Sequence, residues 1–201
     1  MIVVGLTGSI AMGKSTVAQM FVQSGWPVFD ADAAVHAFYR SEGADVVERA
    51  FPGVAVDGVV DRGLLSAKVL GDAEAIRKLE AIVHPAVGIA REHFLAKALA
   101  ERRRGVALDI PLLFETGGEK RCDFVVVVSA SAQSQQQRAL SRPGMTAERL
   151  DALRARQIPD AEKRRKAHFV VDTDLTMSDT ARQIGDFVRA VVGVPGGYRG
   201  L

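Results

Sequence analysis

The chain has 201 residues, of which 48% are hydrophobic and 25% are charged, and its formal net charge is +2. This composition fits one globular domain with a substantial core and excludes a chain that is disordered throughout. The one cysteine, Cys122, excludes an intramolecular disulfide and a cysteine-based metal site. No stretch approaches 18 apolar residues, and the apolar start, residues 1–6, is too short for a signal peptide. We therefore expect a cytoplasmic protein with no membrane partner.

The first predicted element is an apolar strand over residues 2–6, and a glycine-rich loop follows it directly. The loop reads Gly8-Ser9-Ile10-Ala11-Met12-Gly13-Lys14-Ser15, a complete match to the pattern GxxxxGK[ST]. In such a loop the backbone N–H groups surround the phosphates of a nucleotide, the lysine meets the β- and γ-phosphates, and the hydroxyl binds Mg²⁺. Residues 14–24 have apolar side chains at helical spacing, so the loop opens a helix whose N-terminus faces the anion. The motif predicts a site for ATP and Mg²⁺, with Ser15 on the metal and a nucleotide-binding set of Gly8, Ala11, Met12, Gly13, Lys14, Ser15 and Thr16.

Four more apolar strands are predicted further along the chain, at residues 27–30, 106–110, 124–128 and 169–172. Valine-rich strands that alternate with helices are typical of a parallel sheet in an α/β layer fold. The second and third strands are separated by about 75 residues, far more than one crossover helix needs. We therefore expect a helical insertion over residues 33–100, with helices at 33–39, 44–51, 62–70, 73–83 and 87–102.

A second insertion, residues 138–166, carries a net charge of +5, while the rest of the chain carries −3. A local basic segment fits a small anionic ligand better than a nucleic acid, because it contains no tyrosine on which a base could stack. A turn at Arg142-Pro143-Gly144 and a helix that starts after Thr146 predict that this segment is a hinged lid. After a last helix at residues 178–192, residues 193–201 are rich in glycine and proline and predict a flexible tail.

The motif alone does not distinguish a kinase, a GTPase switch and a mechanical ATPase. The chain has no Asn-Lys-x-Asp motif for guanine, and no catalytic carboxylate pair follows Asp109 at the end of the third strand. A helical insertion after the second strand and a basic lid after the fourth are typical of small-molecule kinases, in which one binds the acceptor and the other excludes water. The layout does not identify the acceptor of such a kinase. Another small-molecule or nucleoside kinase, and a nucleotide-binding switch without an acceptor, stay open as alternatives.

Seven blocks, in order and spread over nearly the whole chain, resemble the dephospho-coenzyme A kinase family. They are Gly5–Gly8 with Gly13–Thr16, Asp30-Ala31-Asp32, Asp61-Arg62 with Leu65, Leu79–Pro85, Asp109–Glu115, the lid with Arg138 and Arg142, and Gln157 before Val170–Asp172. The chain departs from the family's usual loop, Gly-Gly-Ile-Gly-Ser-Gly-Lys, at Ser9, Ala11 and Met12. It also has Thr173 where the family usually has asparagine.

The resemblance implies a P-loop kinase-like, three-layer α/β fold within a single domain, residues 1–201. A five-stranded parallel sheet is flanked by helices, and the insertion at 33–100 binds the acceptor. It implies that the γ-phosphate of ATP passes to the ribose 3′-hydroxyl of dephospho-CoA, the last step of coenzyme A biosynthesis.

The resemblance also implies roles for individual residues. Asp32 is the candidate catalytic base, although N-capping of a helix at Ala33 is its alternative role, and Asp30 contacts the water shell of the metal or caps the next helix. Lys14, Arg138 and Arg142 are the candidate catalytic cations. Arg62, His84, Pro111 and Leu113 are the candidate contacts to dephospho-CoA, together with Asp32.

Overall fold

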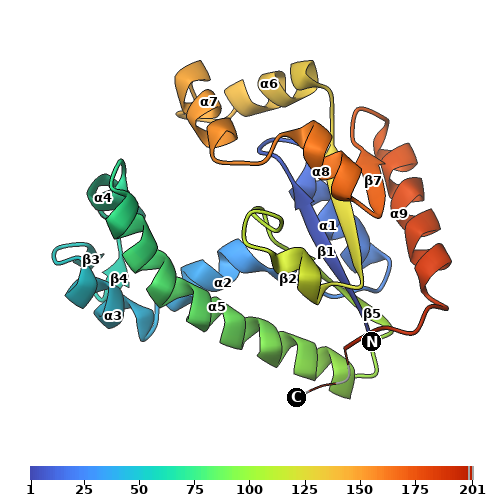
Figure 1. Ribbon diagram of the computed structural model, residues 1–201, viewed down its shortest axis with the longest axis horizontal. Coiled ribbons are helices and arrows are strands. Elements are labelled where there is room, and N and C mark those ends of the chain that lie inside the picture. The colour runs from blue at the N-terminus through green and yellow to red at the C-terminus, as the bar shows by residue number, and fades with distance from the viewer. Residues whose placement is uncertain (199, 201) are drawn as a thin grey trace. The chain divides into compact units, whose positions relative to one another are not determined.

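The protein is described here by a computed structural model that covers residues 1–198 and 200 (Figure 1). The chain divides into two compact units. Unit 1 consists of Met1–Phe29 and Ala96–Leu201, and unit 2 consists of Asp30–Leu95. The predicted acceptor-binding insertion, residues 33–100, overlaps unit 2 over residues 33–95.

Unit 1 is built on one five-stranded sheet. Its strands are β1 (Ile2–Gly8), β2 (Val28–Asp30), β5 (Gly105–Asp109), β6 (Phe124–Ser129) and β7 (Phe169–Asp172), in the spatial order β2-β5-β1-β6-β7. The pairs β1–β5, β1–β6 and β6–β7 are parallel, with Ile2 opposite Gly105 and Val4 opposite Phe124. The predicted five-stranded parallel sheet is therefore confirmed, and the P-loop follows its central strand.

The two faces of this sheet pack against different elements, because successive strand residues point to opposite sides. Val126 and Val128 face a cluster with side chains of α1 (Lys14–Gln23) and α9 (Met177–Val191), which lie over the same face (Figure 1). Val125 and Val127 face Leu113 and Phe114, in the loop that follows β5. The remaining helical elements of unit 1 are a 3₁₀ turn (Gly118–Arg121), α6 (Ala132–Leu140), α7 (Ala147–Ala155) and α8 (Asp160–Lys166).

Unit 2 is mainly helical and has its own core. Its elements are α2 (Ala31–Phe38), α3 (Gly43–Ala50), β3 (Ala55–Val56), β4 (Val59–Val60), α4 (Arg62–Val69) and α5 (Ala73–Ala100), the last of which ends in unit 1. Tyr39, Val47, Phe51 and Val83 are among the buried side chains of the core. The antiparallel pair β3–β4 was not predicted, because two residues per strand are too few to show an alternating pattern.

The prediction of two helices at 73–83 and 87–102 is wrong, since α5 is one helix of 28 residues with Pro85 inside it. A proline removes one helical hydrogen bond and usually ends a helix. Here Val83 and Val87, on either side of the proline, belong to the same core of unit 2, so packing holds both parts of the helix. Neither α5 nor any other helix in the described residues is long and apolar enough to cross a membrane.

The C-terminal residues bond to the start of β1. Asp123 accepts hydrogen bonds from the backbone N–H of Val3 (2.7 Å) and of Gly197 (2.8 Å), and the Met1 ammonium donates to the Tyr198 carbonyl (3.1 Å). The flexibility predicted for residues 193–201 stays a prediction, and Arg199 and Leu201 lie outside the described residues.

Candidate active site

The phosphate-binding loop connects β1 to α1 and turns through backbone conformations that favour glycine. Gly13 has a φ of 90° and Ala11 a φ of 61°, both in the left-handed region. At Gly8 an added Cβ would lie 2.6 Å from the Val128 carbonyl oxygen, so only glycine fits against β6 at that point. Alternation of ordinary and left-handed residues turns backbone N–H groups toward one side, which makes an anion-binding concavity. The loop therefore suits the phosphates of a nucleotide.

Lys14, the first residue of α1, forms an ion pair with Asp109, the last residue of β5. Both side chains are largely buried, with 18% and 6% of their surface exposed. Because β1 and β5 are parallel neighbours, their carboxyl ends lie at the same edge of the sheet, where open α/β sheets bind ligands. The Asp109 carboxylate thus holds the Lys14 ammonium beside the loop, where an incoming phosphate can take the place of the carboxylate.

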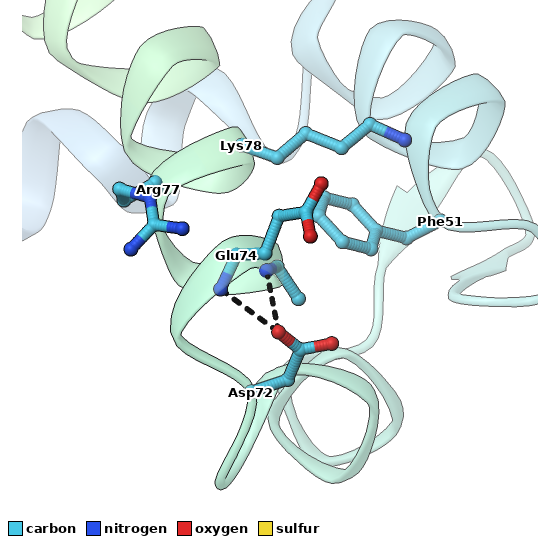
Figure 2. A pocket seen from close by; sticks show the side chains of 6 residues that line it. Phe51, Asp72, Glu74, Arg77 and Lys78 are labelled. Carbon is cyan, nitrogen blue, oxygen red and sulfur yellow. Dashed lines mark hydrogen bonds between the residues drawn. The ribbon is translucent and has the colours of Figure 1, made fainter.

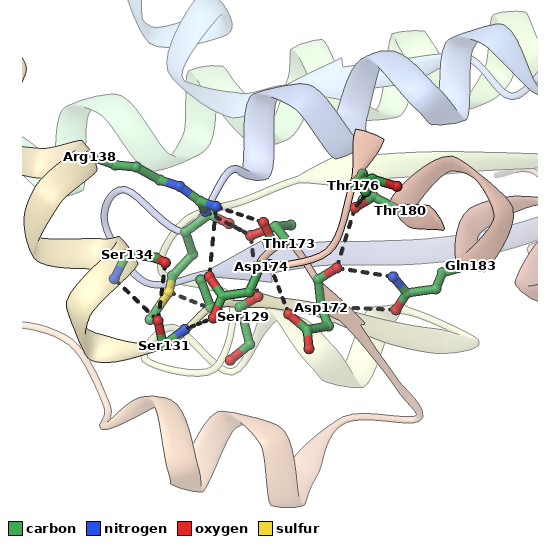
Figure 3. Close-up of polar contacts among 12 residues, drawn as sticks. Ser129, Ser131, Ser134, Arg138, Asp172, Thr173, Asp174, Thr176, Thr180 and Gln183 are labelled. Atoms are coloured by element: carbon green, nitrogen blue, oxygen red, sulfur yellow. Dashed lines mark hydrogen bonds and ion pairs between the residues drawn. The ribbon is translucent and has the colours of Figure 1, made fainter. Parts of the chain in front are cut away.

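Arg138, in the last turn of α6, is attached to the loop after β7 (Figure 3). Its guanidinium donates to the Thr173 hydroxyl (2.9 Å) and carbonyl (2.6 Å), and it lies 3.8 Å from an Asp174 carboxylate oxygen. The Thr173 hydroxyl in turn donates to the Met12 carbonyl in the phosphate loop (2.8 Å). Hydrogen bonds from the Ser134 side chain and from the Ser131 backbone are the main causes that hold the pKa of Asp174 below its usual value. The predicted cation Arg138 is therefore linked to the phosphate loop through Thr173.

Arg142 lies in the predicted lid, just after α6, and its side chain is exposed. No hydrogen bond or ion pair of its guanidinium is found among the described residues, whereas the Arg138 guanidinium makes two hydrogen bonds to Thr173. Residues of the predicted lid pack on the phosphate loop: Leu150 of α7 and Ala139 of α6 form a small buried cluster with Ala11. Arg142 is thus an exposed cation in a segment that contacts the loop.

Ser15, the predicted Mg²⁺ ligand, is exposed in the first turn of α1. The described residues contain no group of three or more His, Cys, Asp or Glu side chains that could hold a metal ion. Mg²⁺ in phosphoryl-transfer sites is held by one or two protein oxygens together with substrate phosphates and water, so a single hydroxyl beside a phosphate loop fits this ion.

In the loop after β5, Pro111 is half-buried and accepts a hydrogen bond at its carbonyl from the Thr7 hydroxyl (3.0 Å). Leu113, the other candidate contact from this loop, has no exposed surface and belongs to the core beside β6. An added Cβ at Gly5 would lie 2.7 Å from its Cδ2. The position of Leu113 therefore indicates packing beneath the loop rather than contact with a substrate.

The remaining candidate residues belong to unit 2. Asp30 is the N-cap of α2, and its carboxylate accepts a hydrogen bond from the Ala33 N–H (2.9 Å). The capping role considered for Asp32 is therefore taken by Asp30, because the helix starts two residues earlier than predicted. Asp32, Arg62 and His84 are all exposed, on α2, α4 and α5 respectively. Burial raises the pKa of Tyr39, and the positive charge of Arg62 opposes that rise.

Unit 2 also has a surface pocket of about 480 Å³ (Figure 2). It is lined by Phe51, Asp72, Glu74, Ala75, Arg77 and Lys78. Lys78 lies over the Phe51 ring, 5.1 Å from its centre, while Asp72 accepts hydrogen bonds from the N–H groups of Glu74 (2.8 Å) and Ala75 (3.0 Å). These two bonds lower the pKa of Asp72. No predicted acceptor residue lines this pocket.

Sequence reasoning missed several residues around the phosphate loop. The Lys14–Asp109 pair was not predicted, although a carboxylate at the end of a neighbouring parallel strand is a usable signal. Gln135, which is 6% exposed and bonds to the loop, gave no signal, because it stands in a run of six residues that are all polar, residues 133–138.

Comparison with known proteins agrees with this geometry. The sequence profile of the family described as dephospho-CoA kinase matches residues 2–179. A dephospho-CoA kinase of Rhodopseudomonas palustris strain HaA2 is 52% identical over 195 residues, which cover 97% of this chain and 98% of that protein. One from Mesorhizobium japonicum is 58% identical over 173 residues, or 86% and 88% of the two chains. A crystal structure of a Thermus thermophilus protein superimposes with a TM-score of 0.83 at 34% identity, covering 97% and 98%. The chain belongs to the dephospho-CoA kinase family.

Proposed function

We propose specific roles for the residues above in a reaction whose class the family establishes. The chain is a kinase that transfers phosphate to an alcohol and serves the final step of coenzyme A biosynthesis. The proposed reaction moves the γ-phosphoryl group of ATP to the ribose 3′-hydroxyl of dephospho-CoA, in the cytoplasm. The observation that carries the nucleotide assignment is the loop at residues 8–13, with left-handed Ala11 and Gly13 and with Lys14 held beside it by Asp109.

In the proposed reaction the loop N–H groups hold the phosphates, and the Lys14 ammonium leaves Asp109 for the β- and γ-phosphate oxygens. The Asp109 carboxylate keeps this ammonium beside the loop before the nucleotide arrives, so the cation is already close to the site that the phosphates take. Mg²⁺, with Ser15 as its protein ligand, would neutralise charge on the phosphate oxygens. Arg142 supplies a further cation from the lid, where its guanidinium is available.

On the acceptor side, the proposed base is Asp32, because Asp30 is committed to the helix cap. A new bond forms between the 3′-oxygen and the γ-phosphorus, the bond between the γ-phosphorus and the bridging oxygen breaks to release ADP, and the hydroxyl proton passes to the Asp32 carboxylate. Proton transfer is late in a loose transition state, so orientation of the hydroxyl is a large part of this role. We propose Arg62, His84 and Pro111 as further contacts to dephospho-CoA.

A panel of acceptors tests this proposal. ADP release is measured with Mg²⁺ and ATP in the presence of dephospho-CoA, a nucleoside monophosphate, or no acceptor. We expect turnover that depends on dephospho-CoA, and we expect Lys14→Met to lower it by about 10²- to 10³-fold, the scale of a lost charge that stabilises the transition state. Turnover with the nucleoside monophosphate alone would favour another kinase, and release independent of any acceptor would favour a nucleotide switch.

A further inference from the structure

The backbone of Ile10, in the middle of the phosphate loop, is held on both sides by glutamine side chains. Its N–H donates to Gln157 Oε1 (3.0 Å), and its carbonyl accepts from Gln135 Nε2 (2.8 Å). Gln157 follows α7 and Gln135 belongs to α6. A residue of α6 and a residue of the predicted lid, just after α7, therefore hold a single loop residue.

The opposite end of the Gln135 amide is bound by a lid arginine. Its Oε1 accepts from Arg154 Nε (3.1 Å) and from a terminal guanidinium nitrogen of Arg154 (2.7 Å), and Arg154 lies in the last turn of α7. The orientation of the amide follows from its partners, because a carbonyl only accepts and a guanidinium only donates. The NH₂ group must face Ile10 and the oxygen must face Arg154. Gln135 is 6% exposed, so its partners are protein groups on both sides.

We propose that Gln135 is a positioning residue that couples the lid helix α7 to the phosphate loop. The path runs from Arg154 through the Gln135 amide to the Ile10 carbonyl. Since the amide bonds at both ends, a movement of α7 changes the position of the Ile10 peptide, and with it the N–H groups that meet the phosphates. This inference rests on the assignment of the loop as the ATP site.

This role of Gln135 differs from stabilisation of the fold alone, because the bond that bears on catalysis is the one from its NH₂ group to the Ile10 carbonyl in the phosphate loop. A misplacement of about 1 Å in groups that orient a reacting phosphate costs on the order of 10²-fold in rate. A residue that only stabilised the helix would change the folded fraction and leave the turnover of folded protein unchanged.

The variant Gln135→Glu distinguishes a positioning role of Gln135 from a role that only stabilises the fold. The carboxylate still accepts from Arg154 but cannot donate to Ile10, and two oxygens then face each other across the broken bond. Gln136→Glu is the matched control, since it makes the same chemical change one residue further along α6, at an exposed position. We would measure kcat, ATP affinity by calorimetry, and the thermal midpoint of each variant.

We expect kcat, referred to the folded fraction, to fall by about 10- to 100-fold in Gln135→Glu, by analogy with other misplaced reacting groups. We expect the control to match wild type, and ATP affinity to change less than the rate. Equal kcat values in the two variants would overturn the proposal. So would a loss of activity that disappears once the folded fraction is taken into account.

A double-mutant cycle tests the path itself. For this cycle Gln135→Met replaces Gln135→Glu, because it removes both amide bonds without placing a buried carboxylate opposite Arg154. Combined with Arg154→Met, it should lose little more than the more affected single variant. Fully additive losses would show that Arg154 acts separately from Gln135 and would overturn the coupling. Because ATP affinity is measured without an acceptor, an inactive wild-type protein with normal ATP binding would count against the proposed function alone.

Discussion

At the scale of single residues, two aspartates on one short segment serve different purposes. Asp30 closes the N-terminus of α2 with its carboxylate, whereas Asp32, two residues on, is exposed in the first turn of the helix. An N-cap carboxylate contributes to stability, while an exposed carboxylate in the first turn is available to a substrate. The two residues therefore offer a matched pair for separating stability from chemistry.

We expect Asp30→Ala to lower the stability of unit 2 by about 1 kcal/mol, the usual cost of losing an N-cap, with turnover of the folded protein largely retained. Asp32→Ala should lower kcat by about 10²- to 10⁴-fold, the contribution of a positioned general base, with little change in thermal midpoint. Thermal melts and kcat for both variants check this. If Asp30→Ala were the inactive variant, the assignment of the base to Asp32 would have to be withdrawn.

Arg138 and Arg142 are expected to form a second pair of this kind, in which the loss of Arg138 affects stability and the loss of Arg142 does not. Arg142→Ala should lower kcat more than ATP affinity and leave stability unchanged, because its exposed guanidinium makes no hydrogen bond or ion pair within the described structure. Arg138→Ala should also lower stability, since it removes the bonds to Thr173. Single-turnover kinetics, ATP calorimetry and melts separate the two variants. Weaker ATP binding with normal kcat in Arg142→Ala would show that Arg142 only anchors the nucleotide.

At the scale of elements, one glutamate organises the turn between α3 and the β3–β4 pair. Glu48 accepts hydrogen bonds from the N–H groups of Gly53 (2.6 Å), Val54 (2.9 Å) and Ala55 (2.7 Å). The bond from Gly53 is the largest cause that lowers the pKa of Glu48 below its usual 4.5. The carboxylate, rather than the carboxylic acid, is therefore the form that stabilises the turn.

This shift predicts how unit 2 responds to acid. Since the pKa of Glu48 is lower in the folded chain, its contribution is fully present above the unfolded value of 4.5 and is lost as the pH falls through the folded pKa. We expect the protection factors of the amides of residues 53–55, which compare the observed exchange rate with the intrinsic rate at the same pH, to fall below about pH 4.5 in wild type. In Glu48→Gln these protection factors should already be low at pH 7 and depend less on acid, while Glu80→Gln, an exposed glutamate on α5, should behave as wild type. Identical profiles in all three proteins would contradict the prediction.

The elements could be predicted from the sequence where a pattern is local. The Val-rich strand at 124–128 and the loop at 8–15 were found because hydrophobic runs and motif spacing depend on neighbouring residues. The continuous helix through Pro85 could not be found, because packing within unit 2 overrides a local rule. The bond from Gln135 to Ile10 could not be found either, because the two residues are 125 positions apart in the chain and no pattern links them. The Lys14–Asp109 pair, 95 positions apart, could be anticipated only from the expectation that parallel strands end at one edge of the sheet.

At the scale of the whole molecule, residues Asp30–Leu95, which include most of the predicted insertion at 33–100, form a separate compact unit with its own buried core. The P-loop, Lys14 and the lid arginines belong to unit 1, and Asp32, Arg62 and His84 belong to unit 2. The proposed nucleotide contacts and most of the proposed acceptor contacts are therefore divided between the units.

This division predicts that the two substrates protect different amides from hydrogen exchange. ADP should slow exchange around residues 8–16 and 135–142, whereas dephospho-CoA should slow it within residues 30–95. At 100 times the dissociation constant, amides that exchange only through opening of the bound unit should slow by about 100-fold. Mass spectrometry of the exchanged protein measures both. Protection of unit 1 alone by dephospho-CoA would contradict the assignment of the acceptor residues.

The position of β1 at the centre of the sheet also bears on how the chain folds as it is synthesised. β1 leaves the ribosome before the other strands of its sheet, yet Ile2 pairs with Gly105 and Val4 with Phe124. Unit 2 is one continuous segment whose core contacts are all available once Leu95 has emerged, so we expect it to fold first. Until β5 and β6 arrive, the apolar strand β1 has two unpaired edges, while unit 2 is already complete. The nascent kinase is therefore most exposed to wrong pairing while its second half is still being made.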